Sequence, residues 1–261
     1  MKISVITPSF NQGHLIEKTI KSVVQQGHSD LEYIVMDGKS SDNTLEVLKM
    51  YEKKLMWVSE IDGGQSDAIN KGIRKASGDI ICYLNSDDTF EPGALEEVAR
   101  FFENNPEVMW AYGKCKIINL DDVEIRKPIT LYKNLLLRRY SYKKLLVENF
   151  ISQPSTFWRM QVHKELGYFD ENEHYVMDYE FWCRLGTKFD AGVINSYLAN
   201  FRMYSTSKSG SLKNPQFDDE LRVAKIYAGN RKMLIALHSI NRLKIVYSYK
   251  IMNFIKNMMS K

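Results

Sequence analysis

The stretch "DIICYLNSDDTFEPG", residues 79–93, predicts a buried strand that ends in two neighbouring acids. Five apolar or aromatic residues run up to Leu84 and are followed by four polar residues: Asn85, Ser86, Asp87 and Asp88. Two like charges about 4 Å apart repel by about 4 kcal/mol at an effective dielectric constant near 20, and a divalent cation would remove that repulsion. The alternative is that the acids and Thr89 cap a following helix. The motif by itself leaves both interpretations open.

The rest of the first half alternates between short apolar strands and segments with apolar residues at helical spacing. Strands are expected at 3–8, 31–38, 55–60 and 79–85. Helices are expected at 15–26, 41–54, 66–76 and 92–105. This alternation, with continuous apolar strands, predicts an α/β fold whose mostly parallel central sheet is flanked by helices.

Beyond Pro106 the alternation is lost. We expect a hairpin at 108–128 that turns near 120–122, and then a helix at 142–151. A strand with a short helix is expected within 153–171, a helix at 178–188 and a strand at 191–204. A polar, mobile loop is expected at 206–216 and a helical tail at 217–261.

The composition is that of an ordinary globular protein. The chain has 261 residues, of which 44% are hydrophobic, enough for one large domain. Its three cysteines are odd in number and far apart, which favours a reducing compartment and argues against a disulfide framework or a zinc cluster. The start "MKISVITPSF" does not look like a signal peptide, and no apolar run is long enough to span a bilayer. We therefore expect a cytoplasmic protein.

The net charge is +4, and positive charge gathers near the end of the chain. Residues 231–261 contain seven Lys and Arg residues and no acid, interleaved with apolar residues, and 132–146 is a second basic and apolar segment. The tail could pack on the main domain, form an oligomer contact or lie on an anionic membrane surface. Acids at the expected strand ends argue against a nucleic-acid partner.

Ligands of open parallel sheets bind outside the carboxyl ends of the strands. The first strand is followed by polar and turn-forming residues, which include Thr7, Pro8, Ser9 and Asn11. Asp37 follows the second strand, and "DGGQSDAINKG", which contains Asp67, follows the third. These segments could also be simple turns. Neither a P-loop nor the usual dinucleotide fingerprint is present.

Asp178 opens an expected helix. It could cap that helix, or it could act as a general base that removes a proton from a hydroxyl. Trp158 and Trp182 are expected in the core or in a pocket wall.

Five motifs in order resemble family 2 glycosyltransferases, which have the GT-A (nucleotide-diphospho-sugar transferase) fold: "VITPSFNQ", "IVMDGKSSDNT", "DGGQSDAINKG", "YLNSDD" and "DYEFWCRL". The resemblance runs from about residue 2 to 205 and is strongest to bacterial enzymes that build O-antigen or capsular polysaccharide. It implies a catalytic domain at 1–205, with a nucleotide-binding half at 1–105 and an acceptor-binding half at 106–205.

The resemblance also implies roles for individual residues. Thr7, Pro8, Ser9 and Asn11 would line the nucleotide pocket with Asp37, whose carboxylate would accept a hydrogen bond from the uracil. Donor binding would further involve Asp67, Asn70, Lys71, Asn85, Ser86 and Asp87. Asp88 would hold the divalent metal, Mn²⁺ or Mg²⁺, and Asp178 would be the general base of an inverting displacement.

Three positions depart from the family pattern. Met177 stands where many relatives have Glu, Asn85 stands where many have an acid, and Tyr204 stands where many have His. Arg202 or Lys208 could compensate for that His, and the loop around Lys208 could close over the donor.

The resulting hypothesis is a metal-dependent, inverting glycosyltransferase that moves a sugar from a UDP-sugar to a glycan acceptor in bacterial surface polysaccharide synthesis. We expect a lipid-linked acceptor and a cytoplasmic protein that can be peripheral on the membrane. One rival is a nucleotidyltransferase, although "TPSFNQG" lacks the expected Gly-rich basic loop. The other is a non-catalytic protein that binds a sugar nucleotide.

Overall fold

A computed structural model describes residues 1–205 and 214–259 of the protein, with backbone alone for 214–215, 246 and 248–259. The first half contains four parallel strands: β1 (Ile3–Ser9), β2 (Leu31–Asp37), β3 (Met56–Ser59) and β4 (Ile80–Tyr83). Three helices connect them: α1 (Ile16–Val24), α2 (Thr44–Met50) and α3 (Gln65–Lys75). The predicted strand–helix alternation is confirmed, with bounds that differ by at most a few residues.

The register of these strands brings their carboxyl ends to one edge of the sheet. Ser9 at the end of β1 pairs with Asp37 at the end of β2, and Asp37 pairs in turn with Ser59 at the end of β3. On the other side of β1, Ile6 pairs with Tyr83, the last residue of β4. The segments that follow all four strands therefore meet at the same edge.

The second half contains four further strands, and the eight form one sheet in the order β3-β2-β1-β4-β7-β6-β8-β5. These strands are β5 (Thr89–Phe90), β6 (Trp110–Ile118), β7 (Thr156–Arg159) and β8 (Gly192–Arg202). β7 is antiparallel to both β4 and β6, whereas β8 is parallel to β6. The sheet is thus parallel in its first half and mixed in its second.

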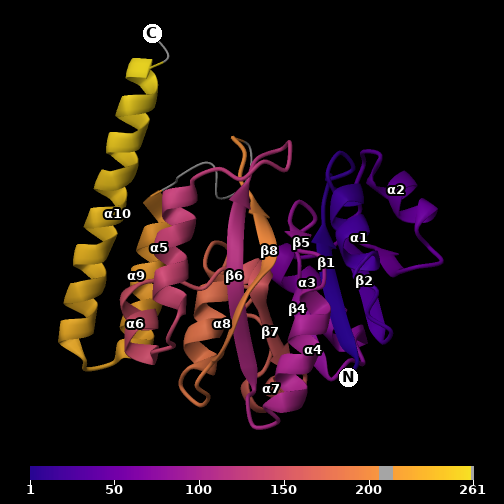
Figure 1. Ribbon diagram of the computed structural model, residues 1–261, viewed down its shortest axis with the longest axis horizontal. Coiled ribbons are helices and arrows are strands. Elements are labelled where there is room, and N and C mark those ends of the chain that lie inside the picture. Colours follow the sequence, from indigo (N-terminus) through magenta and orange to yellow (C-terminus); the bar gives the residue numbers. More distant parts are fainter. Residues whose placement is uncertain (206–213, 260–261) are drawn as a thin grey trace.

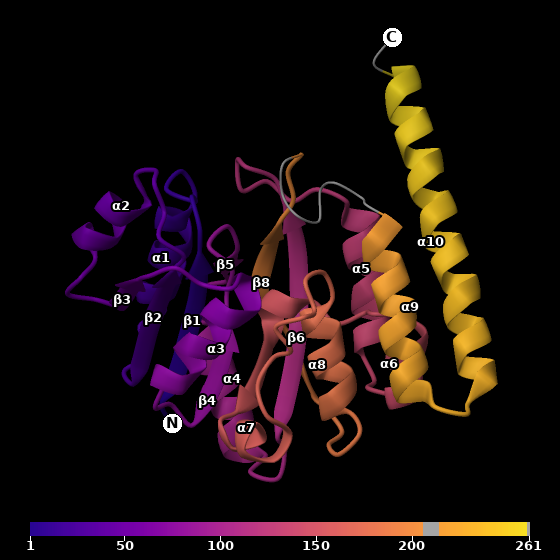
Figure 2. The same ribbon diagram turned by 180° about the vertical axis from the view of Figure 1, so that it is seen from behind.

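Helices cover both faces of the sheet (Figures 1 and 2). Those of the second half are α4 (Ala94–Asn104), α5 (Lys127–Leu137), α6 (Tyr142–Val147), α7 (Gln161–Leu166), α8 (Met177–Leu185), α9 (Asn214–Ala228) and α10 (Lys232–Met259). A short 3₁₀ turn spans Gln153–Ser155. α9 and α10 lie side by side at one end of the molecule, next to α5 and α6 and far from α1 and α2 (Figures 1 and 2).

The core consists of two apolar layers, one on each face of the sheet. Alternate residues of a strand enter different layers: Val5 packs with α1 and α4 residues, whereas Ile6 packs with α3 and α8 residues. Trp158 and Trp182 are fully buried in the second layer, as expected of core residues. Trp182 also stacks on Trp110, with ring centroids 5.8 Å apart.

The expectation for 108–128 is wrong in part, and two elements of the structure, α5 and β5, were not expected. The segment 108–128 is not a simple hairpin: β6 pairs with β7 and β8, and the chain folds back only at an isolated bridge between Ile118 and Glu124. α5 follows, because Pro128 starts a helix and its buried residues recur at helical spacing. Thr89 and Phe90 pair with β8 before α4 begins.

The tail is two helices rather than one. The chain turns at Gly229, whose φ of 54° lies in the left-handed region that glycine adopts without steric cost. Asn214–Gln216, expected in a loop, form the first turn of α9. The rest of that expected loop, with Lys208, lies outside the described residues. In the part of the chain that the structure describes, no helix is both long and apolar enough to cross a membrane.

Candidate active site

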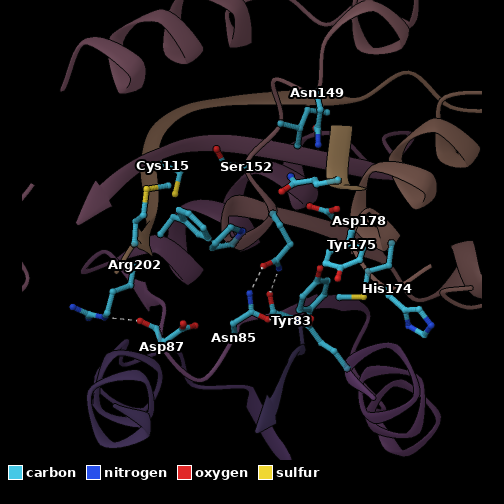
Figure 3. A pocket seen from close by; sticks show the side chains of 18 of the residues that line it. Tyr83, Asn85, Asp87, Cys115, Asn149, Ser152, His174, Tyr175, Asp178 and Arg202 are labelled. Atoms are coloured by element: carbon cyan, nitrogen blue, oxygen red, sulfur yellow. Dashed lines mark hydrogen bonds between the residues drawn. The ribbon is translucent and has the colours of Figure 1, made fainter. Parts of the chain in front are cut away.

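A cavity of about 930 Å³ lies at the carboxyl ends of the parallel strands and extends between α5, α8, α9 and α10 (Figure 3). The part next to the strands, here the sheet end, is lined by residues that include Pro8, Ser9, Gly38 and Asp87. The other part, the helical end, is lined by residues that include Lys133, Asp178, Glu220 and Arg242. One space therefore joins the expected nucleotide segments to the expected general base.

The loop after β1 presents some of its predicted residues to the cavity and not others. Pro8 and Ser9 line it, and the buried Ser9 hydroxyl has no hydrogen-bond partner within the described residues. Thr7 does not line it: its side chain is buried in the opposite direction, 3.1 Å from the Tyr33 hydroxyl. Asn11 has a positive φ of 52° and ties this loop to the next, because its Oδ1 accepts from the Ser41 amide at 2.9 Å.

Asp37 lies beneath the floor of the cavity and is almost fully buried. One carboxylate oxygen accepts from the Ser40 hydroxyl at 2.5 Å. The other accepts from the Ser40 amide at 2.9 Å and from the Ser59 hydroxyl at 2.6 Å. In this structure Asp37 therefore organises the loops after β2 and β3, and a contact with a nucleotide would require an exchange of the Ser40 bond.

The predicted residues of α3 hold neighbouring loops and do not line the cavity. Asp67 accepts from the Gly63 amide at 2.8 Å and pairs with Lys71 at 3.1 Å. Hydrogen bonding from that amide and from Lys71 outweighs burial and lowers the Asp67 pKa. Asn70 clamps Phe169, donating to its carbonyl at 2.9 Å and accepting from its amide at 3.0 Å. Two other residues of this helix, Gln65 and Ala68, line the cavity, and neither is a predicted site residue.

Asn85 is the centre of a polar network on the cavity wall. Its Oδ1 accepts from Gln65 at 2.7 Å, and its Nδ2 donates to Asp88 and to Gln153, both at 3.2 Å. Ser86, the next residue, is buried but also lines the cavity. This network connects α3, the end of β4 and the 3₁₀ turn before β7.

The two adjacent acids have opposite placements. Asp87 lines the cavity, and its Oδ2 accepts from the Tyr204 hydroxyl at 3.0 Å. Asp88 is 0% exposed, and its Oδ1 accepts from the Arg202 amide at 2.7 Å. In this structure β8 therefore covers the Asp88 carboxylate, and a role of Asp88 as metal ligand stays a prediction. Asp87 is the member of the pair that a ligand can reach.

Burial is the main cause of the raised pKa of both acids, and the charge of Asp87 raises the pKa of Asp88 further. A cation beside Asp87 would offset this cost. Among the described residues no three His, Cys, Asp or Glu side chains are grouped to hold a metal ion. The single carboxylate of Asp87 nevertheless fits a Mg²⁺ or Mn²⁺ whose other ligands are phosphate oxygens and water, the usual arrangement for magnesium.

Asp178 lies in the first turn of α8 and reaches the cavity from the side opposite to Asp87 (Figure 3). Its Oδ1 accepts from the Tyr179 amide at 2.8 Å. Helix N-termini stabilise negative charge, so this position suits a carboxylate.

Arg202 holds the backbone at Asp87 and is itself held by several partners. Its Nε donates to the Asp87 carbonyl at 2.7 Å, its other end donates to the Asn119 carbonyl at 2.5 Å, and it pairs with Asp122 at 2.6 Å. The guanidinium is fully buried and held by these partners, but Arg202 also lines the cavity, so its compensation for a missing His stays a prediction.

Glu220 of α9 is a further cavity residue that sequence reasoning missed. Burial, and then the charge of Asp178, raises its pKa to about 7. A usable signal was present: Glu220 precedes the apolar Val223 and Ala224 by three and four residues, so it shares their helix face.

Comparison with known proteins identifies the family of the chain. The profile described as "Glycosyl transferase family 2" matches residues 4–167. An uncharacterized glycosyltransferase of Mycobacterium tuberculosis is 30% identical over 233 residues, which cover 86% of this chain and 84% of the relative. The GalNAc(5)-diNAcBac-PP-undecaprenol beta-1,3-glucosyltransferase of Campylobacter jejuni is 31% identical over 198 residues, which cover 64% of this chain and 62% of the relative.

Two solved structures share the fold at low sequence identity. S. aureus TarS in complex with UDP-GlcNAc superposes with a TM-score of 0.68 at 18% identity, covering 88% of this chain and 67% of that one. The mannosyltransferase PcManGT of Pyrobaculum calidifontis, in complex with GDP-Man and Mn²⁺, superposes with a TM-score of 0.62 at 16% identity, covering 95% and 75%. The fold is GT-A, and the chain belongs to family 2 of the glycosyltransferases.

Proposed function

We propose that the protein transfers a sugar from a UDP-sugar to a hydroxyl of a lipid-linked glycan, with inversion, in the synthesis of a bacterial surface polysaccharide. The observation that carries this proposal is the single cavity in which Asp87 and Asp178 face each other from opposite sides (Figure 3). A donor bound at the sheet end would have its sugar between them. The UDP-GlcNAc complex of TarS and the undecaprenol-linked acceptor in the name of the C. jejuni relative support the two substrate classes.

The donor nucleotide belongs at the sheet end. Pro8 offers an apolar wall, and the unpartnered Ser9 hydroxyl is a buried polar group that a nucleotide could satisfy. Asp37 and Asn11 hold the two loops that frame this end, through Ser40 and Ser41. The cavity thus has a fixed frame and a polar atom free to receive a ligand.

Asp87 would hold a divalent metal ion, together with oxygens of the donor diphosphate. When bound, Mn²⁺ or Mg²⁺ supplies charge neutralisation to the leaving diphosphate. Tyr204 and Arg202 keep Asp87 in place from β8, the first through its carboxylate and the second through its backbone carbonyl. The Mn²⁺ in the PcManGT structure supports a metal in this fold.

Asp178 would act as the general base. The acceptor oxygen forms a bond to the anomeric carbon while the bond between that carbon and the diphosphate breaks. The hydroxyl proton passes to the Asp178 carboxylate. Attack from the Asp178 side, opposite the leaving group, inverts the anomeric centre.

The protein would act at the cytoplasmic face of a membrane through a surface made by two helices. This α5–α10 face consists of the exposed apolar side chains Leu131, Tyr132, Leu135, Met233, Leu237, Ile240, Leu243 and Tyr247. Lys244 joins the two helices, donating to the Tyr132 hydroxyl at 2.9 Å. The exposed apolar residues of α10 recur every three or four positions and so share one side of the helix, whereas Leu234 and Ile235 pack on the core.

Charge favours a membrane over a second copy of the chain as the partner of the α5–α10 face. Lys127, Arg138, Arg139 and Lys232 are exposed around it, and residues 231–261 contain no acid. Two such basic faces would repel each other, whereas anionic lipids attract them. The opposite sides of the same helices, with Lys133 and Arg242, line the helical end of the cavity, so docking would bring the acceptor site close to the lipids.

The proposed function is tested with a panel of nucleotide sugars. Protection against thermal unfolding, with and without Mn²⁺, is measured for UDP-, GDP- and CDP-sugars, and UDP release is then followed with a synthetic lipid-diphosphate-linked sugar. We expect metal-dependent protection by a UDP-sugar alone, followed by UDP release on addition of acceptor. Equal protection by all three nucleotides, or no UDP release with any acceptor or with water, contradicts the proposal.

A further inference from the structure

Three consecutive acids of α9 have different surroundings. Asp218 pairs with Arg242 at 2.5 Å, and Asp219 pairs with Arg222 at 3.3 Å. Glu220 has no such ion pair with any residue that the structure describes, and it lines the helical end of the cavity. The third acid is therefore the one that α9 directs toward the space where an acceptor would bind.

α9 is held firmly against α8, the helix that begins at Asp178. Arg222 makes two hydrogen bonds to Glu173, just before α8, at 2.8 and 2.6 Å. Tyr227 donates to Glu180 of α8, and Val223 and Ala224 are buried in the core. Because these contacts surround it, Glu220 has a fixed position relative to Asp178 and is not a mobile surface acid.

The surroundings of Glu220 are polar but incompletely satisfied. The amides of Gln216 and Asn149 bond to its carboxyl group. Asn149 Oδ1 and the Thr130 hydroxyl also line the cavity, and both are buried without a hydrogen-bond partner in the described part of the chain. Figure 3 shows Asn149 and Asp178 on the same side of the cavity. Unsatisfied buried polar atoms of this kind are what a sugar hydroxyl can bond.

The charged groups that face Glu220 come from every neighbouring helix. They are Asp178 of α8, Lys133 of α5, Glu148 after α6, and His238 and Arg242 of α10. Burial and Asp178 raise the Glu220 pKa to about 7, against the opposing effect of Lys133. Near neutral pH the Glu220 carboxyl group can therefore carry a proton, which it could donate to an acceptor oxygen.

We propose that Glu220 is an acceptor-binding residue that holds a second hydroxyl of the acceptor sugar beside the hydroxyl that faces Asp178. The acceptor would then present two neighbouring hydroxyls to the pair. Met177, which stands where many relatives have an acid, cannot play this part, because its sulfur accepts from the Ser66 hydroxyl at 2.8 Å and its side chain is buried. This inference rests on the proposed transferase function and assigns its acceptor side to a helix beyond the family match at 4–167.

The test compares Glu220→Ala, Glu220→Gln and the matched control Asp219→Asn in the full-length protein. Donor and acceptor KM, UDP affinity and acceptor-independent hydrolysis of the UDP-sugar are measured for each. We expect Glu220→Ala to raise the acceptor KM about tenfold, the effect of losing one good hydrogen bond. We expect Glu220→Gln, which keeps the shape and a hydrogen-bond donor, to stay within about threefold of the wild type. UDP affinity and hydrolysis should change less than about twofold in either variant, because neither involves the acceptor.

The outcomes separate this inference from the proposed function. If the wild type transfers sugar and Glu220→Ala has the same acceptor KM as Asp219→Asn, Glu220 does not bind the acceptor and only this inference is lost. If Glu220→Ala and Glu220→Gln lower UDP affinity as much as they raise the acceptor KM, the role is structural. If the wild type neither transfers nor hydrolyses any UDP-sugar, both proposals are overturned together.

Discussion

The Tyr204 hydroxyl donates to Asp87 Oδ2 at 3.0 Å, and the bond joins the segment after β8 to the segment between β4 and β5. These residues are 117 positions apart in the chain. The bond lowers the Asp87 pKa against the larger effect of burial, which raises it. The same burial, together with the charge of Asp87, raises the Tyr204 pKa to about 12, so Tyr204 keeps its proton at neutral pH. Tyr204 is therefore a permanent donor that helps Asp87 stay ionised.

Tyr204→Phe should narrow the pH range of activity. Without the hydroxyl, the Asp87 pKa rises further, and a higher pH is needed to obtain the carboxylate that a metal requires. We expect kcat/KM to fall by about tenfold near pH 6 and by less than about threefold near pH 8, the size of one lost hydrogen bond to a charged group. A pH–rate profile measures this. An equal loss at every pH would show that Tyr204 does not act through the ionisation of Asp87.

Asp87→Asn and Asp88→Ala should have different effects. Asp87→Asn should abolish the metal dependence of UDP binding, because Asp87 is the acid of the pair that lines the cavity. The thermal stability of this variant should fall little. Asp88→Ala should leave the Arg202 amide buried and unpaired, which costs about 1–3 kcal/mol of unfolding free energy. Calorimetry with Mn²⁺ and UDP, together with thermal unfolding, distinguishes them. The reverse pattern would restore Asp88 as the metal ligand.

Asp178→Asn should remove transfer and preserve donor binding. Loss of a general base typically lowers the rate by about 10²–10⁴-fold. UDP affinity should remain within about twofold, since Asp178 lies across the cavity from Asp87 (Figure 3). Single-turnover transfer and calorimetry on the same sample measure both quantities. Transfer at a near wild-type rate would exclude Asp178 as the base.

Glu220 should make stability depend on pH. Its folded-state pKa of about 7 lies above its ordinary value of 4.5, so between these values the folded chain binds more protons than the unfolded chain. The resulting stabilisation is complete below about pH 4.5 and is lost as the pH rises through 7. Glu220→Gln should remove this dependence. The unfolding free energy of the variant minus that of the wild type should therefore be about 2 kcal/mol larger at pH 8 than at pH 5, a value reduced for the partial exposure of Glu220.

Urea unfolding of Glu220→Gln at both pH values checks this, with Asp219→Asn as the control. The control should follow the wild type, because Asp219 lies at the surface beside Arg222. A constant difference between Glu220→Gln and the wild type would show that Glu220 does not change its protonation on folding.

The α5–α10 face should bind anionic vesicles. Leu131 is 72% and Ile240 is 63% exposed, so Leu131→Glu with Ile240→Glu removes apolar contact and adds repulsion without disturbing the core. We expect vesicle binding to fall about tenfold or more in a flotation assay with phosphatidylglycerol, at about 1 kcal/mol per charge. The control is Met50→Glu, an exposed apolar residue of α2 at the far end of the molecule.

Light scattering separates the rival interpretation of the same face. A wild-type dimer that the double variant converts to a monomer, with no vesicle binding in either protein, would make the face an oligomer contact. Binding by the double variant equal to that of Met50→Glu would remove the face from membrane docking altogether.

The parallel half of the sheet, and the edge at which its strand ends meet, can be predicted from the sequence alone. Apolar runs and helical spacing are local signals, and they predict β1 to β4 with α1 to α4 to within a few residues. Because parallel strands align their carboxyl ends, the sequence also brought Ser9, Asp37 and Asn85 to one edge. α5 was missed because an expected hairpin was extended over its start, although its buried residues recur at helical spacing.

Only the tertiary structure decided which of two adjacent acids faces the cavity. Asp87 and Asp88 have the same chemistry and neighbouring positions, so no local pattern distinguishes them. The distinction comes from β8, whose Arg202 amide binds Asp88 while Tyr204 binds Asp87. Glu220 likewise reaches Asp178 only because α9 packs on α8. Periodicity determines the elements, but contacts between residues more than a hundred positions apart determine which side chains the cavity receives.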